Sequence, residues 1–137
     1  MKRAQAHGPD RLLADKDFGE NVSEIKQLTD KVLAFRDERD WKQFHNSKDL
    51  ALSLVLEATE VLEIFQWKQD QAAIDGVALE RKQDLADELA DVFCYTLLMA
   101  NDLGIDLAKA LKTKIEKNSA KYPVEKAKGS DKKYTEL

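Results

Sequence analysis

Two pairs of acidic residues are the part of this sequence best suited to chemistry. Glu57 and Glu60 form the first pair, and Glu88 and Asp91 form the second. On a helix, a spacing of three residues places both carboxylates of a pair on one face, about one turn apart. Facing carboxylates inside a helical protein repel and are costly to desolvate, but they suit a hard cation such as Mg²⁺. The two pairs therefore predict a metal site.

The alternative for these four acids is an ordinary solvated helix face. Surface acids on helices usually alternate with lysine, whereas Glu57 and Glu60 have no lysine three or four residues away. On a helical wheel of about 100° per residue, Glu57 borders the apolar stripe of its segment and Glu88 borders that of the second segment. Both observations favour the metal site. Glu63 points away from the stripe, and its role stays open.

Four apolar-striped segments would position these carboxylates, which predicts an all-α, four-helix bundle. The expected helices cover about 21–40, 47–68, 79–103 and 106–122, with a loop at Gln69–Val77. Their expected limits are Asn21, Ser47 and Asp106 as N-terminal caps, Gly104 as a C-terminal stop and Pro123 as a helix breaker.

We expect one domain at residues 21–123, preceded by an extension at 1–20 and followed by a lysine-rich tail at 124–137. Within the extension, Met1–Arg11 should be mobile.

The helix expected at 79–103 has more apolar surface than a small bundle can cover. Its predicted core line is Leu85, Leu89, Val92, Thr96, Met99 and Leu103, yet most residues from Val92 to Ala100 are apolar. One chain would have to wrap this helix entirely, which four short helices can hardly achieve. A homo-oligomer is therefore predicted.

The last expected helix carries candidate phosphate-binding residues. Asn118 shares an apolar face with Leu107, Leu111, Ile115 and Tyr122, and Lys114 and Lys121 flank it. A buried amide needs hydrogen-bond partners, which a neighbouring backbone or a substrate could supply. Lysines are also ordinary surface residues, but together with Asn118 they favour contacts to phosphate oxygens.

Two tryptophans suggest a site for a planar ring. Trp41 lies in the first connector, close in sequence to His45, and Trp67 lies at the end of the second helix. Indole faces can stack on a nucleobase, although simple core or hinge packing would explain both residues equally well.

Bulk properties exclude several classes of protein. The net charge is −4, so we expect no nucleic-acid partner, and no apolar run is long enough to span a membrane. Cys94 is the sole cysteine, which excludes a disulfide framework and favours a reducing, cytoplasmic compartment.

The acidic pairs and their flanking residues resemble the all-α nucleoside triphosphate pyrophosphohydrolases, the MazG-like superfamily, and within it the dCTP pyrophosphatase branch. The matching text is Glu57-x-x-Glu60 followed after 27 residues by Glu88-x-x-Asp91, with Phe35–His45, Phe65–Lys68, Asn118 with Lys121–Pro123, and Lys133–Leu137.

This resemblance implies hydrolysis of a nucleoside triphosphate to a monophosphate and pyrophosphate with Mg²⁺, or Mn²⁺, and a preference for dCTP or a 5-modified dCTP. It implies that the four acids hold the metal, with Tyr95 near it, and that Trp41 and Trp67 line a base pocket. It implies contacts to phosphate or sugar from four further residues: Lys114, Asn118, Lys121 and Tyr122. It also implies a dimer or tetramer in which a neighbouring chain helps to close each pocket. Some relatives place a histidine where this chain has Val32, so base-edge contacts would fall to backbone, to His45 or to the loop near Gln43.

Three alternatives remain. The enzyme could act on another nucleotide, such as dUTP or a damaged triphosphate. A ferritin-like di-iron bundle would need Glu-x-x-His pairs, and neither His7 nor His45 provides one. A non-enzymatic helical interaction module would explain the stripes, but it would not explain the acidic pairs together with Asn118.

Overall fold

The computed structural model describes residues 16–136, with side chains from residue 24 onward, and every element in that range is helical. The elements are α1 (Lys16–Asp37), the 3₁₀ helix η1 (Trp41–Phe44), α2 (Ser47–Phe65), α3 (Gln71–Glu80), α4 (Lys82–Asp102), α5 (Leu107–Lys121), α6 (Val124–Ala127) and the 3₁₀ helix η2 (Tyr134–Glu136). The predicted all-α class is confirmed, whereas the mobility predicted for Met1–Arg11 lies outside the described residues.

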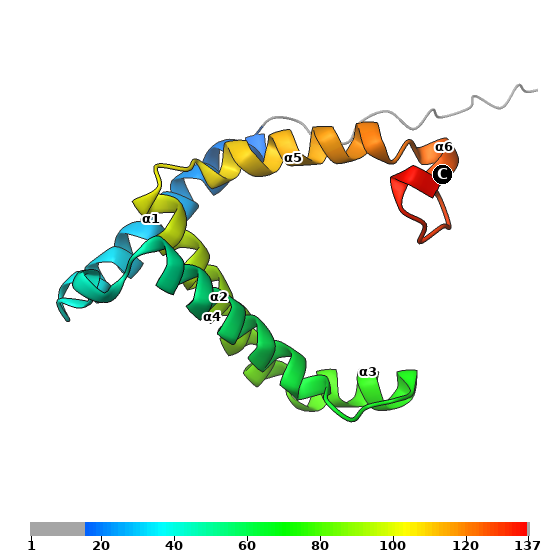
Figure 1. Ribbon diagram of the computed structural model, residues 1–137, viewed down its shortest axis with the longest axis horizontal. Helices are drawn as coiled ribbons and strands as arrows, with labels where there is room; N and C mark the ends of the chain where they lie inside the picture. Colours follow the sequence, from blue (N-terminus) through cyan, green and yellow to red (C-terminus); the bar gives the residue numbers. More distant parts are fainter. Residues whose placement is uncertain (1–15, 137) are drawn as a thin grey trace, which may run out of the picture.

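The core lies between α2 and α4, which run side by side in opposite directions, with α1 packed against α4 (Figure 1). Six apolar side chains are buried in it: Leu50, Ile64, Val77, Leu97, Leu98 and Ala100. None of the helices in residues 16–136 is long and apolar enough to cross a membrane. The two acidic pairs lie on α2 and α4, so the packing of these two helices sets the positions of the four carboxylates.

The predicted core line of α4 is wrong in part, because Leu89 and Leu103 are about half exposed. The buried residues of α4 are Leu97, Leu98 and Ala100. They lie in the half of the helix that both α1 and α2 can cover, so the neighbours of α4 select its core residues more strongly than its own periodicity does.

Several predicted element limits also need correction. The loop expected at Gln69–Val77 is mostly helix α3, because the side chain of Asp70 accepts a hydrogen bond from the Ala73 amide at 2.8 Å and starts an alanine-rich turn. The cap of α2 is Asn46 and not Ser47, and α1 begins before the expected cap Asn21.

Two other predicted limits are confirmed. Asp106 caps α5 by accepting from the Lys109 amide at 2.9 Å, and Gly104 has φ 65° just after α4.

Helix α5 leaves the α2–α4 pair and forms a separate arm (Figure 1). Every residue from Lys109 to Tyr122 is exposed, including Leu111 and Ile115. The expectation that Asn118 is buried is therefore wrong within the described part of this chain, where no other helix covers that face of α5.

Candidate functional site

Three of the four predicted metal ligands converge between α2 and α4. Glu57 from α2 and Glu88 and Asp91 from α4 each offer one carboxylate oxygen, and these oxygens lie within 4.8 Å of one another. Two oxygens bound to one Mg²⁺ at about 2.1 Å lie at most about 4.2 Å apart. A small rotation of these side chains would therefore let them share an ion, so their donor set and spacing fit a hard divalent cation.

The fourth acid, Glu60, lies close enough to Glu88 for its charge to help raise the pKa of Glu88. Burial raises the pKa of Glu57 above its ordinary value, and the charges of Asp91 and Glu60 raise it further. Burial and the same neighbours also raise the pKa of Glu88. Within residues 24–136, no lysine or arginine forms an ion pair with any of these four acids. The cluster therefore carries uncompensated negative charge, which a cation would neutralise.

A pocket of about 220 Å³ adjoins the acidic cluster and shares Glu57 and Asp91 with it. Its other lining residues are Val32, Phe35, Arg36, Trp41, His45, Cys94, Tyr95 and Leu98. The pocket therefore joins the acids of α2 and α4 to the aromatic residues of η1 and of the connector that follows it.

Two ring contacts order the aromatic side of this pocket. Trp41 meets the ring of Phe35 edge-on at 5.8 Å, and His45 meets the ring of Tyr95 edge-on at 6.4 Å. The Nδ1 atom of His45 is buried without a hydrogen-bond partner among the described residues. A buried polar atom usually has a partner, so this nitrogen is available to a ligand in the pocket.

The structure does not bring the two tryptophans together within one chain. Trp41 precedes α2, whereas Trp67 follows its far end, and a helix of 19 residues is about 28 Å long. Trp67 has φ 68° and an indole that is 85% exposed. One chain therefore cannot place both indoles on the same ring.

The candidate phosphate-binding residues are also separate from the acids. Lys114, Asn118 and Lys121 lie on the exposed arm α5, and Tyr122 is its C-terminal cap. This arm runs away from the middle of α2 and α4 (Figure 1). The C-terminal helix η2 packs against the end of this arm through Tyr134. Tyr134 lies edge-on to Tyr122 at 6.0 Å, and the ammonium group of Lys121 lies 4.8 Å from the Tyr134 ring.

Sequence reasoning missed the polar residues behind the pocket. Arg36 is 6% exposed and contacts Asp102, which lies 66 residues away in the chain. A charged residue next to Phe35 on an apolar stripe was the available signal, but nothing in the sequence pointed to its partner. Cys94, the sole cysteine of the sequence, also lines the pocket.

Comparison with known proteins places these features in a group of relatives. The MazG-like family matches residues 52–137 of the chain. The protein is 40% identical over 104 residues to dCTP pyrophosphatase 1 of Homo sapiens, an alignment that covers 75% of this chain and 61% of the human protein. The corresponding protein of Mus musculus is 39% identical with the same coverage, so the chain spans 61% of the length of both relatives.

A solved structure is similar as well. The crystal structure of a pyrophosphatase from Archaeoglobus fulgidus has a TM-score of 0.71 and 39% sequence identity to this chain. The match covers 73% of this chain and 93% of the archaeal one.

Proposed function

The chain belongs to the MazG-like family, and from that premise we propose that it hydrolyses a nucleoside triphosphate to a monophosphate and pyrophosphate. The preferred substrate is dCTP or a 5-modified dCTP. The observation that carries the proposal is the sharing of Glu57 and Asp91 between the acidic cluster and the ring-lined pocket. The printed names of the mammalian relatives and of the archaeal neighbour support the reaction class and, for the relatives, the cytosine base.

The four acids serve the phosphate end of the reaction. Glu57, Glu88 and Asp91, with Glu60 beside them, would hold Mg²⁺ or Mn²⁺, which when bound withdraws charge from the phosphates and lowers the pKa of a coordinated water. The carboxylates must be ionised to serve as ligands, and their mutual repulsion keeps the cluster open to a cation. Because two packed helices hold these acids, only a small rotation of their side chains separates the metal-free cluster from one that shares an ion.

The pocket serves the base. Trp41 offers an indole face for stacking, and Nδ1 of His45 offers a hydrogen bond to a base edge. Val32 lines the same pocket and offers no hydrogen bond. We therefore expect pyrimidines to be preferred over purines by size, with looser discrimination between cytosine and uracil or thymine than in a relative that carries a histidine there.

A second copy of the chain supplies the rest of the site. The apolar residues Leu52, Val55, Leu111 and Ile115 are all more than half exposed, and they extend along the outer faces of α2 and α5. Exposed apolar residues that follow one another along a helix face are typical of surfaces that pair with another chain. In a dimer or tetramer, Trp67 and the α5 residues Lys114, Asn118, Lys121 and Tyr122 of one copy would complete the pocket of another.

A panel of triphosphates tests the function. Purified protein should release pyrophosphate and a monophosphate from dCTP in Mg²⁺ and in Mn²⁺, with no turnover after chelation of the metal. The panel should include 5-methyl-dCTP, dUTP, dTTP, the purine triphosphates and an oxidised purine triphosphate. Release of inorganic phosphate instead of pyrophosphate would contradict the reaction type. Absence of turnover with every member would leave a non-enzymatic helical module as the better description.

A further inference from the structure

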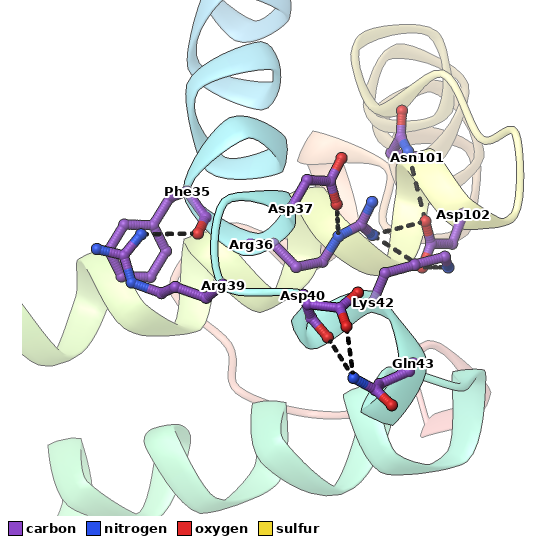
Figure 2. Close-up of polar contacts among 9 residues, drawn as sticks. All are labelled: Phe35, Arg36, Asp37, Arg39, Asp40, Lys42, Gln43, Asn101 and Asp102. Carbon is purple, nitrogen blue, oxygen red and sulfur yellow. Dashed lines mark hydrogen bonds and ion pairs between the residues drawn. The ribbon is translucent and has the colours of Figure 1, made fainter.

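A buried ion cluster lies where the end of α1, η1 and the end of α4 meet (Figure 2). The side chain of Arg36 is 7% exposed, and that of Asp102 is 13% exposed. Arg36 Nη1 donates to Asp102 Oδ1 at 3.1 Å, and Lys42 Nζ donates to Asp102 Oδ2 at 2.6 Å. Arg36 Nε also donates to Asp37 Oδ1 at 2.7 Å. One carboxylate of α4 thus accepts from two different segments.

This carboxylate is held in its charged form. Burial disfavours ionisation of Asp102, but the hydrogen bonds from Lys42 and Arg36 outweigh burial and keep its pKa below the ordinary value. Charge-assisted hydrogen bonds in a partly dehydrated site are stronger and more directional than exposed ion pairs. The three side chains therefore form one bridge, in which Asp102 is the common acceptor.

The bridge attaches η1 to the end of α4 through Lys42. This attachment matters because η1 has no buried residue of its own. The chain enters η1 through Asp40, a non-glycine residue with φ 54°, and Gln43 Nε2 donates to the Asp40 carbonyl and carboxylate at 2.9 Å each. These contacts shape the turn locally, but they do not fix it to the helices. Among the described residues, η1 is joined to the rest of the fold by the edge contact between Trp41 and Phe35 and by the ion pair between Lys42 and Asp102. The guanidinium of Arg39 also lies 5.9 Å from the centre of the Trp41 ring.

The bridge and the pocket share a wall. Arg36 lines the pocket together with Trp41, and Trp41 is the immediate neighbour of Lys42 in η1. A shift of η1 would therefore move the Trp41 indole relative to the acids. We propose that the Arg36–Asp102–Lys42 bridge is a positioning device for the base pocket, which sets the affinity for the nucleotide by holding Trp41 in place. The proposal rests on the proposed function, because it assumes that the ligand of this pocket is a nucleotide base.

Lys42 is the best residue at which to test the bridge. Its side chain is about half exposed, and its loss leaves the buried Arg36–Asp102 pair intact, so the fold should survive. Lys42→Met keeps the aliphatic stem and removes the charge. Lys42→Arg keeps the charge and should restore the bridge. Lys48→Met is the matched control, because Lys48 is exposed at the start of α2 and its one ion pair among the described residues is with its neighbour Asp49, at 3.2 Å.

The kinetic experiment compares KM and kcat for dCTP. Lys42→Met should raise KM about five- to tenfold and leave kcat within about twofold, because the metal-binding acids are untouched. Lys42→Arg and Lys48→Met should stay within about twofold of the wild-type protein in both constants. An unchanged KM in Lys42→Met would overturn the proposal. A lower kcat together with a lower thermal midpoint would also overturn it, because that result would indicate a purely structural role.

A second variant separates positioning from direct contact of Lys42 with the substrate. Asp102→Asn keeps the volume of the side chain and removes the acceptor charge. If Lys42 acts through the bridge, Asp102→Asn should raise KM as Lys42→Met does, and the double variant should be no worse than the worse single one. If Lys42 instead binds a phosphate directly, the two effects should add, and the bridge proposal fails.

An emission measurement tests the bridge without any turnover. The chain has two tryptophans, so Trp67→Phe leaves Trp41 as the sole indole reporter. In that background, Lys42→Met should red-shift the emission and increase quenching by acrylamide, whereas Lys48→Met should change neither. If the wild-type protein hydrolyses no triphosphate, the proposed function fails, and the emission still decides whether the bridge positions Trp41. If the protein is active but neither KM nor emission responds to Lys42→Met, the bridge proposal alone fails.

Discussion

The pocket region and the α5 arm differ in how much of the candidate site one chain can build. Around the pocket, α1, η1, α2 and α4 place Glu57, Asp91 and Trp41 against one another by packing within a single chain. On α5, Lys114, Asn118 and Lys121 are exposed, and Lys121 lies near the Tyr134 ring of η2 and does not line the pocket. The difference suggests that metal binding and the Trp41 side of the base pocket depend on the fold of one copy, whereas phosphate binding and the Trp67 side of the base pocket depend on assembly.

The largest expected effect lies in the pocket region. Glu57→Gln and Asp91→Asn should each lower kcat/KM for dCTP about 100-fold or more, because losing even an outer-shell partner of a metal costs about 10–100-fold. The metal-free Glu57→Gln protein should unfold at the same or a higher temperature, since one of several repelling charges is gone.

Asp87→Asn is the matched control for Asp91→Asn. It makes the same substitution one turn earlier on α4, at a carboxylate that accepts a hydrogen bond from Gln83 at 2.9 Å and lies outside the acidic cluster. Asp87→Asn should keep wild-type activity. Full activity in either acidic-cluster variant would place the metal elsewhere.

A complementation experiment tests whether the acids and the α5 residues of one site come from different chains. Chains carrying Glu57→Gln and chains carrying Asn118→Ala should each be nearly inactive alone. Co-expressed with different tags and purified together, they should regain roughly a quarter of the wild-type activity, since half of randomly formed dimers contain one pocket with both residues intact. A mixed preparation no more active than its components, with subunit mixing verified by tandem purification, would mean that α5 serves its own chain.

Trp67→Ala should have a smaller effect, which falls on binding. Base stacking contributes about 1–3 kcal/mol, so KM should rise about tenfold for all substrates together, with kcat nearly unchanged. The fold should tolerate the change, because the Trp67 indole is exposed. An unchanged KM combined with a changed base preference would show that Trp67 reads a base edge instead of stacking.

The smallest expected effect is a dependence of stability on pH and metal. The pKa values of Glu57 and Glu88 are raised in the metal-free fold, so the stability that protonation adds is full below their ordinary values and is lost as pH rises through the raised ones. Mg²⁺ favours the ionised acids. Mg²⁺ should therefore raise the thermal midpoint more at about pH 7.5 than at about pH 5.

Two observations would check this pH prediction. The gain in thermal midpoint from Mg²⁺ should shrink in Glu57→Gln, whereas Asp87→Asn should keep it. A gain that is independent of pH would indicate that the ion binds away from these acids.

Sequence periodicity predicted the all-α class and the helix faces on which Glu57, Glu88 and Asp91 lie, because both follow from spacing along single helices. It failed for α3, where a capping aspartate and alanines form a helix in most of the loop expected at Gln69–Val77. It also failed for the Arg36–Asp102 pair, because contacts between residues 66 apart depend on how helices cross, which no local pattern records. The metal and phosphate roles stay predictions.

Cys94 lines the pocket and is a site at which the pocket can be labelled chemically. Burial raises the pKa of this thiol, and the charges of Asp91 and Glu57 raise it further, so little thiolate forms near neutral pH. Alkylating reagents should react with it slowly while α2 and α4 stay together. The chain has no other cysteine, so a single mass increment would report each opening of the pocket wall, and the labelling rate would measure how often the α2–α4 pair separates.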